Sequence, residues 1–194
     1  MGMPVTIVAD RRLDEDLFVG AVSFAWQLSD AYGIGYDPQL SIQRISEGDL
    51  RHNRLGQVDC TVIDDLPRFA NKGITAVVVA KDLGVPDNYR RPLNFLYGVS
   101  NFRSGNFIMS THRLKLPEDA GAIALHEAGH SLGLVPETAP NYDRLSSFPG
   151  HCQNVCIMRP GSGYSDVEKM VKHIDSHDPF CVDCIALLRG MRHA

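Results

Sequence analysis

Short apolar runs and helical stripes alternate along the first half of the chain. Val5–Ala9 is a short apolar run that ends in an aspartate, and Ile74–Ala80 is apolar on both faces, so both are predicted to be buried strands. The second run is the stronger and is expected at the centre of a sheet. Leu40–Ser46 alternates as a strand does, and residues 14–31 carry apolar positions at helical spacing. Strands interleaved with helices predict an α/β sheet that is parallel in part.

The second half of the chain contains another long predicted helix and then changes character. Asn94–Val99 and Phe107–His112 are β-rich and are separated by a Ser-Gly-Asn turn. A helix is predicted at Glu118–Gly133, where acidic residues occupy the first turn and a glycine ends the pattern. Residues 134–165 are rich in Pro, Gly, Ser and Asn and show little periodicity. Shorter helices are predicted at Gln57–Leu66, Asp166–Ile174 and Val182–Arg192.

The change at Gly133 indicates two parts within one compact domain, an N-terminal α/β part at 1–133 and a C-terminal part at 134–194. The length of 194 residues suits a single sizeable core. A formal charge of −4 offers no basic surface to nucleic acid, and no apolar run approaches the roughly 20 residues of a membrane helix. The first ten residues lack the charged and apolar regions of a secretory signal, so we expect a cytoplasmic location.

The helix before this boundary carries a pattern typical of zinc peptidases, with His126, Glu127, His130 and Gly133 in the order H-E-x-x-H-x-x-G. Two histidines four residues apart lie on one helix face and can bind one zinc ion. Glu127 is adjacent to them and can accept a proton from a zinc-bound water, whose pKa the metal lowers towards about 7. Gly133 permits a positive φ and a sharp turn that brings later residues back to the metal. The motif predicts a catalytic zinc site with Glu127 as general base.

The third ligand of this site is not evident from the motif. A third histidine is expected three residues after the glycine, where this chain has Pro136. Glu137 and Asp143 are carboxylates near that position, and His151 follows further along the chain. Each of these side chains can bind zinc. A site with only two histidine ligands is the remaining alternative.

Four of the five cysteines form two close pairs in the C-terminal part, Cys152 with Cys156 and Cys181 with Cys184. Where thiols stay reduced, clustered cysteines indicate a metal more than disulfides. Two such pairs can complete a tetrahedral zinc site that has no open position for catalysis. The alternative is a set of unrelated reduced thiols. Cys60 lies among apolar neighbours and is predicted to be a buried thiol.

Together these motifs resemble the archaemetzincins, a metzincin-related family of metallopeptidases marked by H-E-x-x-H-x-x-G-x-x-H-C, then C-x-M, then C-x-x-C. Residues 93–114 also resemble the sheet edge that precedes the active-site helix of the family. The matching residues are His126, Glu127, His130, Gly133, His151, Cys152, Cys156, Met158, Cys181 and Cys184. This chain departs by an insertion at residues 136–150, by a shorter first cysteine spacing and by a longer stretch before the last pair. The insertion is expected to bulge out as a surface loop and return the chain at His151.

The resemblance implies a metzincin-like fold, with a twisted, mixed and mostly parallel sheet, an active-site helix and a small C-terminal helical subdomain held by zinc. It implies two zinc ions per chain, a catalytic ion bound by His126, His130 and His151 and a structural ion bound by the four clustered cysteines. Met158 becomes the Met-turn residue beneath the catalytic metal.

The activity implied by the resemblance is zinc-dependent hydrolysis of peptide bonds. The substrate would be an extended peptide or protein segment bound along a sheet edge, for which residues 106–112 are the candidate. The alternative is a non-catalytic zinc-binding protein, or a peptide-binding module with a vestigial peptidase site. The intact Glu127 argues against this alternative, because a purely structural metal site needs no general base.

Overall fold

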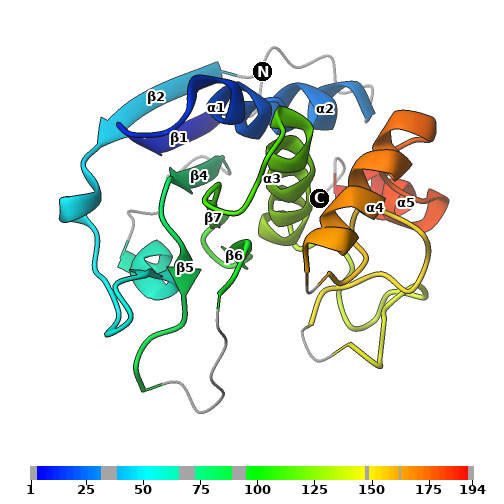
Figure 1. Ribbon diagram of the computed structural model, residues 1–194. Helices are drawn as coiled ribbons and strands as arrows, with labels where there is room; N and C mark the ends of the chain where they lie inside the picture. Colours follow the sequence, from blue (N-terminus) through cyan, green and yellow to red (C-terminus); the bar gives the residue numbers. More distant parts are fainter. Residues whose placement is uncertain are drawn as a thin grey trace.

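A five-stranded sheet forms the central layer of the protein, as the computed structural model shows (Figure 1). The structure describes residues 4–31, 39–65, 73–88, 95–146, 149–161 and 163–191. In spatial order the strands are β2 (Gln39–Ile45), β1 (Pro4–Asp10), β4 (Ile74–Val79), β7 (Asn106–Ser110) and β6 (Gly98–Asn101). The first four pair in parallel, and β6 is antiparallel to β7. This mostly parallel α/β sheet with β4 at its centre confirms the predicted fold class.

Among the described strands, β6 lies at one edge of the sheet and β2 at the other, so the prediction that residues 106–112 form an edge is wrong. β7 lies inside the sheet, between β4 and β6. Its residues Phe107, Ile108 and Met109 are fully buried, whereas all four residues of β6 are half-buried. An apolar strand gains more from an interior position, where both of its faces are covered. The difference in polarity between the two strands of this hairpin therefore determines which one is exposed.

Three helices pack on one face of the sheet, and two more follow in the C-terminal part. Their bounds are α1 (Glu15–Val22), α2 (Phe24–Ala31), α3 (Pro117–Ser131), α4 (Tyr164–Ser176) and α5 (Val182–Met191). The single helix predicted over residues 14–31 is broken at Ser23. The hydroxyl of Ser23 donates a hydrogen bond of 2.7 Å to the carbonyl oxygen of Gly20, which competes with the regular helix pattern. α3 lies between the sheet and α4 (Figure 1).

The helix predicted at Gln57–Leu66 is a short strand followed by a 3₁₀ helix. The strand β3 (Val58–Asp59) pairs with β5 (Leu83–Gly84), and the 3₁₀ helix spans Cys60–Asp65. The carboxylate of Asp59 accepts the backbone N–H of Thr61 at 2.9 Å, which starts the turn at that point. Leu66 lies outside the described residues. A further 3₁₀ turn occupies Glu47–Asp49.

The sheet separates two clusters of buried apolar side chains. Along β4, Ile74, Ala76 and Val78 belong to the larger cluster on the helix side, and Val77 and Val79 belong to the smaller one. This alternation explains why β4 is apolar at every position except the buried Thr75. The larger cluster also includes Met158, Phe180 and Leu188 of the C-terminal part. The division of the chain at Gly133 stays a prediction.

Cys60 lies in the smaller cluster as a buried thiol, which agrees with its predicted role as a small hydrophobe. None of the helices within the described residues has the length and apolar character needed to cross a membrane.

Candidate metal sites

The sequence around α3 determines where this helix begins and ends. Pro117 occupies its first position, and the carboxylate of Asp119 accepts the backbone N–H groups of Lys115 and Leu116, each at 3.1 Å. At the other end, Gly133 has a φ of +73°, as its predicted role in the turn requires. The N–H of Leu134 then donates to the carbonyl oxygen of Gly129 at 3.0 Å. The chain therefore leaves α3 in a sharp turn at Gly133, three residues after the second histidine.

Three histidines meet at the C-terminal end of α3. His126 and His130 come from successive turns of the helix, and His151 comes from the segment after the insertion. Their ring centroids lie 4.6 to 5.3 Å apart, and one nitrogen of each lies within 4.8 Å of the others. The Nε2 atoms of His126 and His130 are 3.1 Å apart. Nitrogens bound tetrahedrally to zinc at about 2.05 Å lie about 3.3 Å apart, so the donor set fits this metal.

The geometry distinguishes between the three candidates for the third ligand. Neither Glu137 nor Asp143 belongs to the cluster, which among the described residues contains His151 with the two helix histidines. Glu137 is exposed. The carboxylate of Asp143 accepts the backbone N–H of Leu145 at 2.9 Å, and its own N–H donates to the carbonyl oxygen of His151 at 2.8 Å. The structure thus places His151 where the resemblance requires it, and its role as a ligand stays a prediction.

Hydrogen bonds and burial prepare these imidazoles to bind a cation. His126 Nδ1 lies 2.7 Å from the carbonyl oxygen of Ile157, and only a protonated Nδ1 can donate this hydrogen bond. The lone pair of Nε2 is then available to a metal ion. His151 Nδ1 lies 3.3 Å from the hydroxyl of Ser146. Burial, together with repulsion from His151, lowers the pKa of His126 to about 4. Burial also holds the pKa of His130 well below its usual value. Neutral imidazole, the form favoured here, is the form that binds metals.

Glu127 faces the edge strand of the sheet. Its carboxylate accepts a hydrogen bond from the hydroxyl of Ser100, and the same hydroxyl also lies 2.8 Å from the backbone carbonyl oxygen of Glu127. A Cβ atom added to Gly98 would lie 2.5 Å from Glu127 Cγ, so a larger residue there would have to displace the Glu127 side chain. Burial raises the pKa of Glu127 to about 7, and the hydrogen bond from Ser100 opposes this rise. Sequence reasoning missed both β6 residues, although their two-residue spacing places them on one face of a strand.

Met158 lies against α3, next to the histidine cluster. It is fully buried, and its sulfur would overlap a Cβ atom added to Gly129. Because Gly129 immediately precedes His130, the methionine packs against the turn that carries the two helix histidines. Gly150 approaches the cluster from the other side, with a φ of +86°, and a Cβ atom added to it would lie 2.8 Å from His130 Nδ1. Neither close approach was predictable from local patterns, because each depends on a partner distant along the chain.

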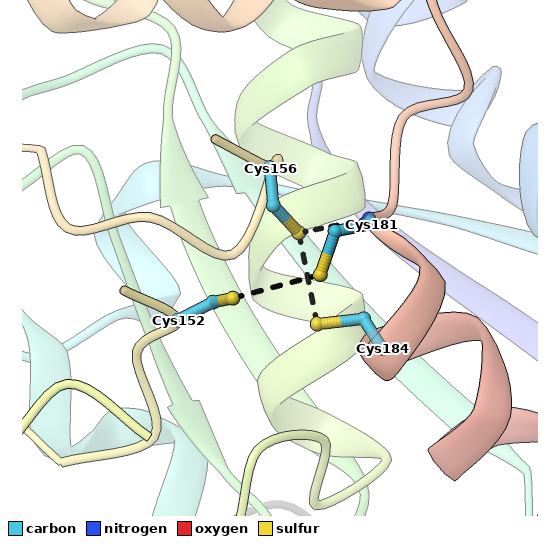
Figure 2. A group of neighbouring side chains, drawn as sticks. All are labelled: Cys152, Cys156, Cys181 and Cys184. Carbon is cyan, nitrogen blue, oxygen red and sulfur yellow. Dashed lines mark hydrogen bonds between the residues drawn. The ribbon is translucent and has the colours of Figure 1, made fainter. Parts of the chain in front are cut away.

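The four clustered cysteines converge from two segments, as Figure 2 shows. Cys152 Sγ lies 3.7 Å from Cys181 Sγ, and Cys156 Sγ lies 3.6 Å from Cys184 Sγ. All four sulfurs lie within 4.8 Å of one another. Four sulfurs at about 2.3 Å from a tetrahedrally coordinated zinc ion lie about 3.8 Å apart. The arrangement fits a zinc ion and argues against the interpretation of these residues as unrelated thiols.

Backbone and side-chain N–H groups donate hydrogen bonds to these sulfurs. Cys156 Sγ accepts the backbone N–H groups of Met158 and Cys181 at 3.5 and 3.4 Å. The neighbouring thiols of Cys156 and Cys184 lower the pKa of Cys152, and their own pKa values are raised in turn. Four thiols this close cannot all ionise unless a cation offsets their charges. The cluster therefore has the electrostatics of a metal site.

Most of the described residues of the insertion are exposed, as expected of a surface loop, and the chain returns at His151, but part of the segment packs back against the cysteines. Tyr142 and Cys152 form an antiparallel bridge, and the N–H of Gln153 donates to the carbonyl oxygen of Asn141 at 2.9 Å. Asn141 and Ala139 are buried. The segment folds back because its backbone groups find partners along the ligand-bearing segment and its small or amide side chains fit beside the cysteines. Sequence reasoning treated the insertion as a spacer and missed Asn141 and Ser146.

The fold and the two clusters together define an α/β architecture of the archaemetzincin type. The structure matches archaemetzincin from Methanopyrus kandleri with a TM-score of 0.73, at 21% identity over 100% of this chain and 97% of the other. It matches archaemetzincin from Archaeoglobus fulgidus, solved in complex with malonate, with a TM-score of 0.62, at 21% identity over 95% and 99%. A zinc-dependent peptidase from Methanocorpusculum labreanum follows with a TM-score of 0.59, at 19% identity over the same shares. No protein-family profile and no curated protein matches the sequence. At these identities the comparisons establish a shared fold.

Proposed function

We propose that this protein is a zinc-dependent metallopeptidase. The observation that carries the proposal is the meeting of three imidazoles on and beside α3, next to a carboxylate that the edge strand holds in place. His126, His130 and His151 would bind the catalytic zinc ion, and their spacing suits a site with a fourth position for substrate or water. The shared fold with two archaemetzincins and a zinc-dependent peptidase supports this function.

When bound, zinc would polarise the scissile carbonyl group and acidify a water molecule beside it. Glu127 takes a proton from the attacking water and later gives it to the leaving amine, which makes it both general base and general acid. The hydroxyl of Ser100 positions this carboxylate through its hydrogen bond. Gly98 leaves the space in which the carboxylate lies.

The substrate is a peptide or protein segment that binds in extended form along β6. β6 pairs with β7 on one side, and within the described residues no strand pairs with its other side. An extended peptide can add to such an edge through main-chain hydrogen bonds. Because Gly98 and Ser100 of this strand contact Glu127, a peptide bound along it would pass the histidine cluster.

The second zinc ion has a structural role. Cys152, Cys156, Cys181 and Cys184 would complete its coordination, leaving no position for a substrate. This ion would join the segment after the insertion to the start of α5. Thiolate ligands suit a cytoplasmic location, where cysteines stay reduced.

Digestion of a proteome-derived peptide library tests this function. The zinc-loaded protein should create new peptide ends that mass spectrometry detects, and Glu127→Gln should create none while it keeps its zinc. The carboxamide preserves size but cannot accept the proton. Cleavage by Glu127→Gln at the parent rate would refute the mechanism. A zinc-loaded protein that binds extended peptides without any Glu127-dependent cleavage would favour the non-catalytic alternative.

A further inference from the structure

The inserted segment at residues 136–150 contributes a side chain to the cysteine cluster. We infer that Asn141 is a positioning residue that strengthens metal binding by Cys152, Cys156, Cys181 and Cys184, through N–H···S hydrogen bonds. This inference rests on the proposed function in one respect, because it requires that the cluster bind a metal. The insertion would then help to assemble the cysteine site and would be more than a spacer.

The amide group of Asn141 lies between sulfurs from both cysteine pairs. Its Nδ2 atom is 3.1 Å from Cys152 Sγ and 3.2 Å from Cys184 Sγ. One NH₂ group carries two donors, so it can serve both sulfurs at once. The side chain is 1% exposed, which removes competing water. Asn141 thus links the ligand segment after the insertion to the first turn of α5.

The chemistry of the sulfurs explains the orientation of the amide. A thiolate is an acceptor, and four thiolates around a divalent cation carry a net charge of about −2, which is costly to bury. Two N–H donors offset part of that charge. The other amide atom, Oδ1, is buried and has no hydrogen-bond partner among the residues that the structure describes. Burying an acceptor without a hydrogen bond costs free energy. The N–H···S hydrogen bonds of this amide must therefore contribute more free energy than the desolvation of Oδ1 costs.

The backbone around Asn141 holds its side chain in place. Its carbonyl oxygen accepts the N–H of Gln153, and the next residue, Tyr142, bridges to Cys152. The N–H of Asp143 donates to the carbonyl oxygen of His151. The insertion is thus paired along the ligand segment on both sides of Cys152, and the amide needs little further ordering to reach the sulfurs. Hydrogen-bond donors that are fixed against metal ligands in this way typically change metal affinity by about 10- to 100-fold.

Cobalt binding to the full-length protein tests the inference. Co²⁺ bound by thiolates gives an intense sulfur-to-metal absorption band, which reports the cysteine cluster and not the histidines. Titration with a chelator then measures the affinity of this cluster. We expect Asn141→Leu to lower the Co²⁺ affinity by about 10-fold or more and to shift the band to lower energy. Asn141→Asp should lower the affinity further, because a carboxylate repels the thiolates.

Asn106→Leu is the matched control. Asn106 is also 1% exposed, its Oδ1 atom also lacks a partner within the described part of the chain, and its Nδ2 atom donates to a backbone carbonyl group far from the cysteines. Its replacement should lower thermal stability but leave the Co²⁺ band and the affinity unchanged. Equal affinities and bands for the parent and Asn141→Leu would overturn the inference. So would an equal loss of affinity in both leucine variants.

Cadmium NMR provides a test that needs no variant, should Asn141→Leu fail to fold. In the parent protein loaded with ¹¹³Cd²⁺, the side-chain amide protons of Asn141 should show a scalar coupling to the metal across the N–H···S bonds. A metal signal from four thiolates with no such coupling would overturn the inference alone. A parent protein whose cysteines bind neither Cd²⁺ nor Co²⁺ would overturn both the inference and the proposed structural site.

Discussion

His151 and Cys152 are consecutive residues whose side chains enter two different clusters. The imidazole joins His126 and His130, and the sulfur lies 3.7 Å from Cys181 Sγ. A single peptide bond therefore connects the two candidate metal sites. Any displacement of Cys152 moves the backbone of His151, so the order of the cysteine cluster affects the geometry of the histidine cluster.

Replacement of Cys181 with Ser should release one zinc ion per chain and weaken the second site as well. The cluster loses a thiolate, and the tether on His151 loosens because Cys152 loses its neighbour. Metal analysis should show that one equivalent of zinc is lost and that a chelator removes the other more easily. The melting temperature should also fall. Cys60→Ser, the matched control at a buried thiol outside the cluster, should keep both ions. Unchanged zinc content in Cys181→Ser would contradict the structural site.

Removal of the His151 side chain tests the third ligand. His151→Ala should lower the zinc affinity of the histidine site by roughly 100-fold or more, because two imidazoles alone form an incomplete site. Glu137→Ala should have no effect, since Glu137 is exposed and outside the cluster. Chelator competition in the zinc-loaded protein measures both. Loss of zinc from Glu137→Ala but not from His151→Ala would reverse the assignment.

A double-mutant cycle tests the contact between Gly129 and Met158. Gly129→Ala alone should cost about 1–3 kcal/mol of unfolding free energy, because the new Cβ atom meets the methionine sulfur. Met158→Ala alone should cost about 2–5 kcal/mol through the cavity that it leaves. The double variant should lose less than the sum of these costs, because the methyl group added to the helix then fills part of that cavity. Additive losses in urea unfolding would show that the two residues do not touch.

Ser100→Ala tests how Glu127 is held. The variant should bind zinc as the parent does and cleave peptides about tenfold more slowly, in line with the loss of one hydrogen bond to a charged group. Ser100→Thr keeps the hydroxyl and should restore most of the rate. The measurement is the turnover number on the best peptide of the library. A parental rate in Ser100→Ala would remove Ser100 from the mechanism.

The ion pair between Asp82 and Arg113 should make stability depend on pH. Two hydrogen bonds from the guanidinium, at 2.8 and 2.7 Å, lower the pKa of Asp82, although burial opposes them. A carboxyl group with a depressed pKa in the folded state stabilises the fold above its unfolded pKa of about 3.9, and this contribution fades as pH falls through the folded value.

Asp82→Asn should therefore cost less than about 1 kcal/mol at pH 7, because Arg113 is 43% exposed and solvent weakens the pair. The difference from the parent should shrink as the pH falls below the unfolded pKa of about 3.9 and vanish once Asp82 is protonated in the folded state as well. The control is Asp87→Asn, which removes the more exposed pair with Arg54 and should change little. Urea unfolding across this pH range measures both variants. A loss that persists unchanged at low pH would show that the charge of Asp82 is not its cause.

Much of the fold follows from local patterns in the chain. The apolar run at residues 74–80 predicted the central strand, because its residues face a core on both sides. The helix with His126 and His130 was also predictable, since its spacing and its terminal glycine are local properties. The assignment of the sheet edge failed because the sequence identifies two β-rich segments without stating which one pairs with β4.

The parts of the site that sequence reasoning missed depend on contacts between distant residues. Ser100 and Gly98 matter only because β6 passes Glu127, and Gly150 matters because its backbone lies against His130. Asn141 was missed because polar residues in a segment rich in Pro and Ser usually face solvent. The position of His151 was found through the motif that follows it, and not through any periodicity of the segment itself.

The cysteine cluster draws on three stretches of chain, at Asn141, at Cys152 and Cys156, and at Cys181 and Cys184. None of these stretches can close the cluster alone, and the last one follows a helix of 13 residues, α4. The order of folding follows from this layout. The sheet and α3 can form from the preceding residues, whereas the cluster must wait until α5 has docked and brought the final pair of thiols. We therefore expect metal capture by the cysteines to be a late step of folding, and the histidine site, joined to them through the His151–Cys152 peptide bond, to reach its final shape with it.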